Sequence, residues 1–395
     1  TDVTMGQIVD RSRPGKKGKF TPWIRRMCGP VAVASFLMYA TYFKGMPMGF
    51  KIFWMFFTYL LWGSVCYTGV NIPYGSMASA ISDNPTDRTS LSNWRTIGAT
   101  LAQTAIGVIL PLVVYYTDAA GNSVLSGEKM MIGALICSIG AVICYMLCYH
   151  MTTERVKVEQ NTQKFSFKEL VHNKSLIGII VCALVFLLAQ LSLSNMNAYV
   201  YPNYFGNIKA MSIASLAGTV VILALSTFIV KLASKIGKKE LSMIGCFISA
   251  ASFILLFIIH THNVLVWVGL IIVATIGTSM FNMVIWAMIT DVIDESEVQT
   301  GVRQDGTIYS VYSFARKLGQ ACSSGLSGVL LSIIGYTSVT AFDPKVVDGI
   351  YNITCLVPAG GMILLLLALW FLYPLNKKRV EENAEKLRIK RNENA

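Results

Sequence analysis

Charged side chains are scarce in this chain. Asp, Glu, Lys and Arg make up 14% of its 395 residues and hydrophobic residues make up 54%, whereas a soluble domain contains about 25% charged residues. Residues 52–82, 96–117 and 175–208 contain no charge, and 241–290 is interrupted only by the short polar run 260–263. A membrane-spanning helix needs roughly 20 apolar residues. The sequence therefore excludes an ordinary soluble protein and predicts an all-α polytopic membrane protein.

Recognisable catalytic motifs are missing as well. None of the four histidines stands in the His-Glu-x-x-His spacing of a zinc hydrolase, and there is no Gly-x-x-x-x-Gly-Lys-Ser/Thr loop to hold the phosphates of ATP. The nine cysteines are scattered through apolar stretches, where a thiol behaves as a small hydrophobic side chain. We therefore predict no enzyme activity, no catalytic residue, no metal site and no bound cofactor. A polytopic membrane enzyme is the remote alternative.

The net charge of +12 is unevenly distributed along the chain. Four basic segments hold 23 Lys and Arg, and they alternate with connections that hold five in total. Cytoplasmic loops of membrane proteins carry such an excess of positive charge. We therefore predict a multi-pass protein of the cell membrane with its C-terminus in the cytoplasm, and no nucleic-acid partner. The basic segments are 11–26, 151–174, 231–239 and 377–395.

Hydropathy and the charge boundaries together predict ten complete spans. Because the chain begins without methionine, we expect a first helix and part of a second to precede residue 1. This would give two six-helix bundles, the architecture of a major-facilitator transporter. The predicted organisation is a truncated N-terminal bundle (1–150), a central cytoplasmic loop (151–174), a C-terminal bundle (175–375) and a basic cytoplasmic tail (376–395). The spans are predicted near 23–43, 52–81, 93–117, 130–150, 175–200, 210–231, 240–260, 264–290, 306–335 and 350–373.

Ionisable residues inside predicted spans are the first candidates for function, because a charge at the bilayer centre costs at least ~2.5 kcal/mol. Lys317 lies about 16 Å into its span at 1.5 Å per residue, where it could bind a sugar hydroxyl or a carboxylate; a salt bridge between helices is the alternative. Its neighbour Arg316 points about 100° away around the helix. Asp2 falls within the truncated second helix and is a candidate cation or proton site.

Polar and aromatic side chains in other spans complete the candidate binding site. Thr68 and Asn71 are neighbours at i, i+3 in a span loosened by Pro73, and they can line a polar cavity together. Arg95 can reach a substrate or extend its charged end to the membrane surface. The remaining candidates could stack on a sugar ring or form hydrogen bonds with its hydroxyl groups; they are Trp286, Asn282, Tyr309 and Tyr312. The alternative is that they only pack against neighbouring helices, as aromatic residues at helical spacing most often do.

Charged residues in the connections between predicted spans are expected to form salt bridges that gate access to the transport site. The run from Asp291 to Asp305 is interpreted as a cytoplasmic loop whose side chains form salt bridges with the basic loops. Solvated surface charge is the alternative interpretation. The predicted gating residues are Asp10, Arg11, Arg88, Asp291, Asp294 and Arg303.

Three long motifs resemble one transporter family. They are DVTMGQIVDRSRPGKKGKFTPW from Asp2, NIPYGSMASAISDNPTDRTSLSNWR from Asn71 and DVIDESEVQTGVRQDGTIYSVYSFARKLGQA from Asp291, and the likeness extends over essentially the whole chain. The chain is similar to the glycoside–pentoside–hexuronide:cation symporters, a major-facilitator branch that includes carriers of melibiose, lactose, glucuronides and xylosides. The resemblance implies a secondary transporter that moves a glycoside or related sugar together with H⁺ or Na⁺ by alternating access.

The resemblance also implies roles for individual residues. Asp2 would belong to the cation site, and Thr68 and Asn71 would lie where the fourth helix meets both ion and sugar. Arg95 and Lys317 would contact the sugar or take part in coupling.

Two positions depart from the melibiose-type pattern. Asn71 stands where sodium-coupled members have Asp, and Gly75 stands where they have Trp. Since an amide is a weaker sodium ligand than a carboxylate, protons are the preferred coupling ion. A carrier of the same fold for an amphiphile such as a lysolipid is the alternative, although Asn71, Arg95 and Lys317 favour a polar solute. The expected partners are a small sugar and membrane lipid, and a monomer is expected.

Overall fold

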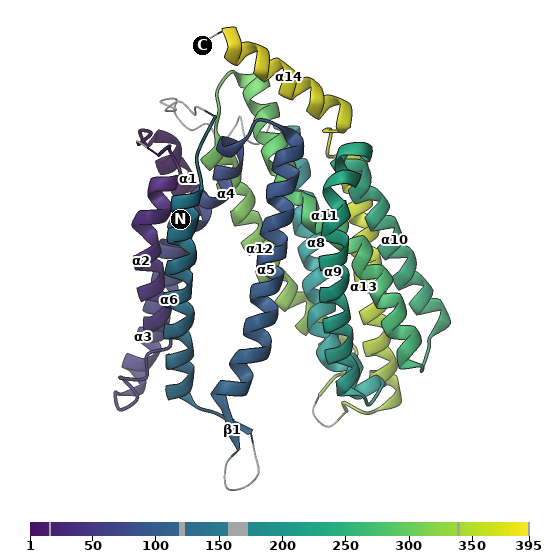
Figure 1. Ribbon diagram of the computed structural model, residues 1–395. Helices are drawn as coiled ribbons and strands as arrows, with labels where there is room; N and C mark the ends of the chain where they lie inside the picture. Colours follow the sequence, from purple (N-terminus) through teal and green to yellow (C-terminus); the bar gives the residue numbers. More distant parts are fainter. Residues whose placement is uncertain (16, 118–122, 157–172, 338–339, 394–395) are drawn as a thin grey trace. The chain divides into compact units, whose positions relative to one another are not determined.

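The computed structural model describes residues 1–15, 17–117, 123–156, 173–337 and 340–393, and these residues are almost entirely helical (Figure 1). Most of the predicted central loop, residues 157–172, lies outside the described residues. The chain divides into two compact units. Unit 1 consists of the described residues of Thr1–Asp83, Gly98–Phe165 and Thr300–Val311, and unit 2 of those of Asn84–Ile97, Ser166–Gln299 and Tyr312–Ala395.

Unit 1 contains the amino-terminal helices and one short antiparallel hairpin. The predicted span 52–81 is a continuous helical segment with a π-helical turn, η1, in the middle. The elements are α1 (Asp2–Arg11), α2 (Thr21–Met38), α3 (Met48–Leu60), η1 (Leu61–Cys66), α4 (Tyr67–Ile81), α5 (Pro85–Val114), β1 (Tyr115–Thr117), β2 (Ser123–Leu125) and α6 (Gly127–Met151). The first residues of α5, up to position 97, belong to unit 2.

Unit 2 contains the remaining long helices. Its elements are α8 (Lys174–Tyr199), the π-helical turn η2 (Val200–Tyr204), α9 (Ile208–Ile236), α10 (Lys238–Ile259), α11 (Val264–Thr300), α12 (Asp305–Ile333), α13 (Pro344–Phe371) and α14 (Lys377–Glu393). The first residues of α12, up to position 311, belong to unit 1.

Each predicted span coincides with helical structure, and several helices extend beyond the predicted bounds, α5 and α11 among them. α5 begins at Pro85 because Asn84 caps it. The Asn84 side chain accepts a hydrogen bond from the Thr86 amide at 2.8 Å, and proline fits the first turn of a helix because it has no amide hydrogen to leave unpaired.

α11 also continues beyond its predicted span, and here the sequence interpretation is wrong. Asp291 and Asp294 do not lie in a loop, because α11 continues through them to Thr300. The carboxylates of Asp291, Asp294 and Glu295 are buried, and each forms an ion pair with a cation of unit 2. A helix can bury charge in this way only when each charge has a partner.

Within the described ranges, seven helical segments are long and apolar enough to cross a membrane. The other predicted spans coincide with α2, α5 and α12, whose sequences are more polar; α12, for example, contains Arg316 and Lys317. The face of α3 exposes Phe53, Phe56 and Phe57. Large exposed side chains of this kind suit contact with lipid rather than water. The seven segments are Met48–Ile81, Gly127–Met151, Lys174–Tyr204, Ala210–Ile236, Lys238–Ile259, Val264–Thr300 and Pro344–Phe371.

The segment after α6 fixes the start of α2 in unit 1. Glu154 accepts hydrogen bonds from the backbone amides of Lys19, Phe20 and Thr21 at 2.7–2.9 Å and from the Thr21 hydroxyl at 2.5 Å. Amides at a helix start have no partner within the helix, and a carboxylate also complements the helix dipole there. Glu154 therefore sets where the basic loop before α2 ends.

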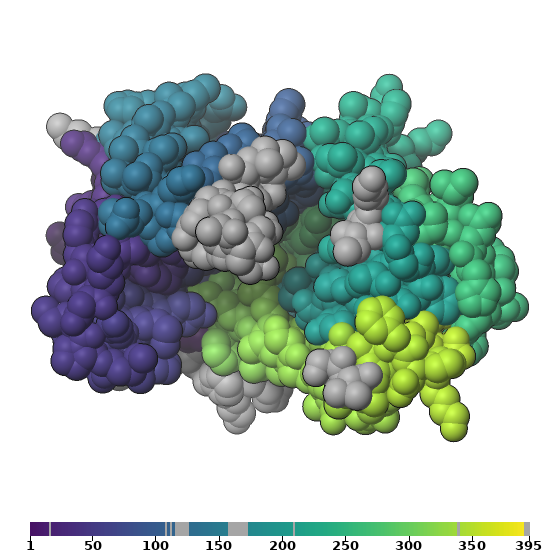
Figure 2. Space-filling model, turned by 90° about the horizontal axis from the view of Figure 1, so that it is seen from below, coloured from purple at the N-terminus to yellow at the C-terminus, as the bar shows by residue number. Residues whose placement is uncertain are grey.

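Unit 2 contains an aromatic core. Tyr351 and Trp267 are fully buried there with their rings 5.2 Å apart. The Tyr351 hydroxyl donates to the Leu256 carbonyl at 2.8 Å. On the face shown in Figure 2, the residues after α8, in teal, lie beside those before α13, in yellow-green, and Asn203 donates to the Ala341 carbonyl at 3.2 Å. This core holds together the helices α8, α10, α11 and α13.

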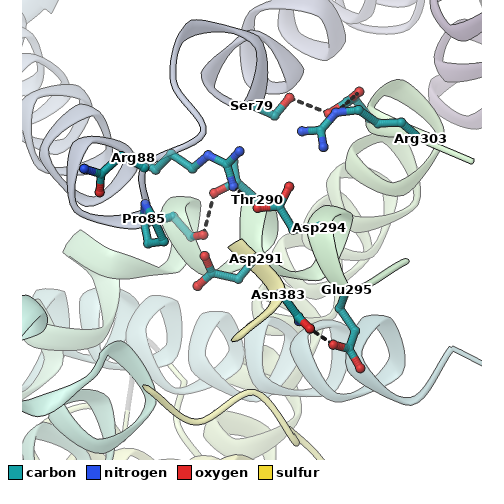
Figure 3. Close-up of polar contacts among 12 residues, drawn as sticks. Ser79, Pro85, Arg88, Thr290, Asp291, Asp294, Glu295, Arg303 and Asn383 are labelled. Carbon is teal, nitrogen blue, oxygen red and sulfur yellow. Dashed lines mark hydrogen bonds and ion pairs between the residues drawn. The ribbon is translucent and has the colours of Figure 1, made fainter. Parts of the chain in front are cut away.

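The basic tail forms α14, which is bound to the end of α11. Glu295 of α11 forms an ion pair with Arg379 and accepts a hydrogen bond from the Asn383 side chain at 2.5 Å (Figure 3). Leu387, one turn farther along α14, is also buried. The tail is therefore an ordered part of unit 2.

Candidate functional site

The predicted cation site lies in unit 1, on α1 and α4. Asp2 is buried with an exposed fraction of 3%. The Thr68 hydroxyl donates to Asp2 Oδ1 at 2.8 Å and also lies 3.2 Å from the Gly63 carbonyl. Asn71 lies one turn farther along α4 and is half-buried. The structure thus brings Asp2 and Thr68 together. A carboxylate in an apolar environment needs such donors or a bound cation to balance its charge.

The predicted substrate residues on α5, α11 and α12 lie in unit 2. The Arg95 guanidinium carbon lies 3.6 Å from the centroid of the Trp286 ring. The Tyr312 ring meets the same indole edge-on, with centroids 5.8 Å apart. Asn282 precedes Trp286 by about one helical turn on α11 and is half-buried. Three predicted residues from three helices therefore form one cluster.

Sequence reasoning missed a second arginine in this cluster. Arg316 places its guanidinium carbon 4.5 Å from the Trp286 centroid and 5.9 Å from that of Tyr312. Lys317, which the sequence favoured, is half-buried and follows it on α12. The signal for Arg316 was its i, i+4 spacing from Tyr312, which places the two on one helix face. Two guanidinium groups that contact one ring at these distances are at most roughly 8 Å apart, so their mutual repulsion is at least about 2 kcal/mol at an effective dielectric constant of 20.

Two of the predicted gating residues hold the start of α12 in unit 1. Asp10, at the end of α1, accepts hydrogen bonds from the Gly306 and Thr307 amides at 2.9 and 2.7 Å and from the Thr307 hydroxyl at 2.6 Å. The helices approach closely, since a Cβ on Gly306 would lie 2.7 Å from the Gly6 carbonyl oxygen. Arg303 forms an ion pair with Asp305, with 3.0 Å between Arg303 Nε and Asp305 Oδ2.

The α12 start is also bound to α4. Asp305 accepts a hydrogen bond from the Ser79 hydroxyl (Figure 3), and its backbone carbonyl accepts one from Ser76 at 3.3 Å. The remaining gate candidate of this unit, Arg11, is exposed. Asp10 also lies 4.0 Å from the ammonium group of Lys19. Sequence reasoning missed Lys19, Ser76 and Ser79, because only the fold brings these segments together.

The other predicted gating residues form two ion pairs in unit 2. Arg88, near the start of α5, is 1% exposed and pairs with Asp294 (Figure 3). Asp291 binds Lys238 through both carboxylate oxygens at 2.7 Å. Lys238 was not predicted as a site residue, although it belongs to the basic connection between α9 and α10. Together with Glu295, these residues give α11 three paired carboxylates within two turns.

Gly75 of α4 faces Tyr309 of α12 within unit 1. A Cβ on Gly75 would overlap the Tyr309 ring, so glycine is required for this contact. We expect Gly75→Ala to lower the melting temperature of the detergent-solubilised protein, because overpacking a tight contact costs about 1–3 kcal/mol. Gly29→Ala in α2 is the matched control, since a Cβ there meets nothing within 4 Å. Equal melting temperatures for the two variants would show that the contact of Gly75 with Tyr309 is not tight.

The chain matches the family described as MFS/sugar transport protein over residues 1–377. It is 31% identical to the uncharacterized symporter YjmB of Bacillus subtilis (strain 168) and 30% identical to the glucuronide carrier protein homolog of Escherichia coli (strain K12), in each case over 96% of this chain and 82% of the relative. It is 28% identical to an isoprimeverose transporter of Lactiplantibacillus pentosus, over 96% of this chain and 81% of that protein.

The fold is shared with solved transporters. The crystal structure of the major-facilitator transporter FucP matches with a TM-score of 0.67 at 11% identity, over 94% of this chain and 86% of that one. The fold predicted from the sequence is thereby confirmed, and the family that the chain matches is one of transporters. The chain belongs to the MFS/sugar transport protein family, in the glycoside–pentoside–hexuronide:cation symporter branch, and is a multi-pass membrane transporter.

Proposed function

We propose that the protein carries out cation-coupled symport of a glycoside or related sugar by alternating access. The observation that carries this proposal is the cluster of Arg95, Trp286 and Tyr312 in unit 2. A sugar presents apolar C–H faces that pack on an aromatic ring, and hydroxyl groups that bind charged donors. The relatives named for a glucuronide and for isoprimeverose support a sugar of this kind.

The proposed cation site is the buried pair of Asp2 and Thr68 in unit 1, with Asn71 beside it on α4. The carboxylate of Asp2 can take up a proton or bind a sodium ion together with the Thr68 hydroxyl. Protons are the preferred ion, because Asn71 does not supply the second carboxylate that a hard sodium ion favours. The half-buried Lys317 and Asn282 are proposed to complete the sugar site.

The gate is proposed to consist of the ion pairs and caps at the ends of α1, α5, α11 and α12. Asp10, Arg11 and Arg303 would act through the start of α12, and Arg88, Asp291 and Asp294 through the start of α5. We further propose a monomer in the cell membrane with a cytoplasmic C-terminus, since Lys and Arg are enriched in the tail and in alternate connections, as is typical of cytoplasmic segments. The two bundles of 1–150 and 175–375 are retained as the proposed domain organisation, joined by the loop 151–174 and followed by the tail 376–395.

The test is uptake of labelled glycosides into proteoliposomes that contain the whole chain. An imposed inward proton gradient should drive accumulation above equilibrium, and a protonophore should abolish it. Accumulation that follows a sodium gradient alone would identify sodium as the coupling ion. A transport rate that depends on neither the proton gradient nor the sodium gradient would contradict the proposal that sugar uptake is coupled to a cation.

Asp2→Asn should reduce gradient-driven accumulation at least tenfold while it leaves sugar exchange at equal concentrations largely intact. The reason is that a neutral amide cannot take up and release a proton, although it fills the same space. Asp343→Asn, which neutralises an exposed carboxylate, is the control. Equal loss of accumulation and exchange in Asp2→Asn would instead indicate a folding role.

A further inference from the structure

Exposed cations gather in unit 1 where the start of α2 lies beside the end of α6. The ammonium nitrogen of Lys17 lies 4.3 Å from the centroid of the Tyr149 ring, and the guanidinium carbon of Arg25 lies 5.6 Å from the same centroid. Arg26, the next residue of α2, is exposed as well. Among the residues that the structure describes, these three cations form no ion pair with a carboxylate. We call Lys17, Arg25, Arg26 and Tyr149 the basic cluster.

Two carboxylates that lie close to the start of α2 are already bound to other groups. Glu154 accepts hydrogen bonds from three backbone amides and one hydroxyl at the start of α2. Asp10 accepts three hydrogen bonds from the start of α12. The Tyr149 ring attracts the two cations beside it but does not neutralise them. Since neighbouring cations repel each other, an anion that binds between them is favoured.

Apolar surface that suits lipid adjoins the basic cluster. On α2, Pro30 follows Arg26 by about one turn and Val33 by about two turns, and both side chains are exposed. On α6, Met151 stands two residues after Tyr149 and is 82% exposed. Apolar side chains exposed in this way fit the hydrocarbon of a membrane better than water, and tyrosine is enriched where hydrocarbon meets the lipid headgroups. The basic cluster is therefore suited to contact with headgroups.

The combination of cations and apolar surface restricts the ligand. A phosphate group is an anion whose oxygens match the planar donors of a guanidinium and attract an ammonium group. A free phosphate ion or an acidic protein segment could bind the cations, but it would leave Pro30 and Val33 uncovered. A phospholipid covers both surfaces. The basic segments of this chain are those proposed to face the cytoplasm, where the membrane leaflet carries anionic lipids.

We propose that Lys17 and Arg25 bind the phosphate group of an anionic phospholipid beside the Tyr149 ring, and that its acyl chains lie along the exposed face of α2. Arg26 adds positive charge that favours an anionic headgroup. A zwitterionic phospholipid brings a positive choline group close to these cations and should bind more weakly. The site is separate from the proposed sugar and cation sites, so the proposal does not depend on which solute the protein transports.

The first test measures lipid selectivity by native mass spectrometry of the whole chain, delipidated in detergent and mixed with equal amounts of dioleoyl phosphatidylglycerol and dioleoyl phosphatidylcholine. We expect phosphatidylglycerol to be retained at least about fivefold more, because each Lys or Arg at an anionic surface favours binding. Equal retention would overturn the proposal. So would displacement of the lipid by inorganic phosphate or by a soluble polyglutamate peptide, beyond that caused by chloride at the same ionic strength.

The second test locates the site. The double variant Lys17→Gln with Arg25→Gln should lower the retention ratio at least about threefold, and Tyr149→Leu should lower it less. The matched control, Lys129→Gln with Lys345→Gln, removes two exposed cations outside the basic cluster and should leave the ratio unchanged. Because the ratio compares two lipids on one preparation, a lower yield of folded variant does not alter it. An unchanged ratio in the first double variant, or an equal fall in both, would overturn the assigned site.

Discussion

Arg88→Ala is expected to destabilise the protein by about 3–5 kcal/mol and to abolish transport. Arg88 is fully buried, and its removal leaves the buried carboxylate of Asp294 without its partner. Breaking a buried ion pair from one side has this cost because the remaining charge stays desolvated. The measurement is the melting temperature and the yield of monodisperse protein in detergent, together with uptake of a labelled glycoside into proteoliposomes.

A double-mutant cycle separates the pair from its surroundings. Arg88→Ala with Asp294→Ala should be less destabilising than the two single changes added together, because the double variant leaves no lone charge. The control is the exposed pair of Lys44 and Glu128, 3.1 Å apart, where Lys44→Ala should have little measurable effect since solvent screens the charges. If the changes at Arg88 and Asp294 were additive, the two side chains would not stabilise each other.

Asp10→Ala is expected to have the second-largest effect, a destabilisation of about 2–3 kcal/mol with at least a tenfold loss of transport rate. Asp10 accepts three hydrogen bonds at the start of α12. Charge-assisted bonds to free helix amides are among the stronger contacts of their kind, and the helix dipole adds to them. Melting temperature and initial uptake rate measure the two effects.

Graded variants test whether the cap is the cause. Thr307→Val removes only the hydroxyl donor and should have a smaller effect than Asp10→Ala. Asp10→Asn keeps one acceptor oxygen and should lie between the two. If Asp10→Asn and Asp10→Ala both behaved like the unaltered protein, the start of α12 would be held by other contacts, such as the bond from Ser79 to Asp305.

The long helices and several contacts could be predicted because each depends on residues close in sequence. Charge-free stretches located the spans, and Asp2 stood out as an acidic residue that would fall within the truncated second helix. The sequence could not show that Thr68 donates to Asp2, since 66 positions separate them. It placed Trp286 and Tyr312 in spans but could not show that Arg95 reaches the same indole ring.

The sequence-based predictions were wrong where contacts between residues distant in sequence determine the structure. The acidic run after Thr290 has the composition of a loop, yet cations from α5, α10 and α14 let it remain helical and buried. Lys317 was preferred over Arg316 because depth in the span was the only available criterion. Helix packing determines which face of α12 lies against α11, and Arg316 is on the face that contacts Trp286. Glu154 could not be predicted as a cap for α2, since 133 residues separate it from Thr21.

The attachment of α14 to Glu295 affects how the orientation of the chain should be established experimentally. Deleting the tail and attaching a reporter enzyme at residue 376 would remove Arg379 and Asn383, the two partners of Glu295 on α14, and leave it only the Gln299 side chain of α11. Since Asp294 is the adjacent residue, such a truncation would disturb the paired carboxylates of α11 as well as report on sidedness. A reporter joined after the last residue would leave them intact, and so would accessibility labelling of a cysteine introduced at the exposed Lys378.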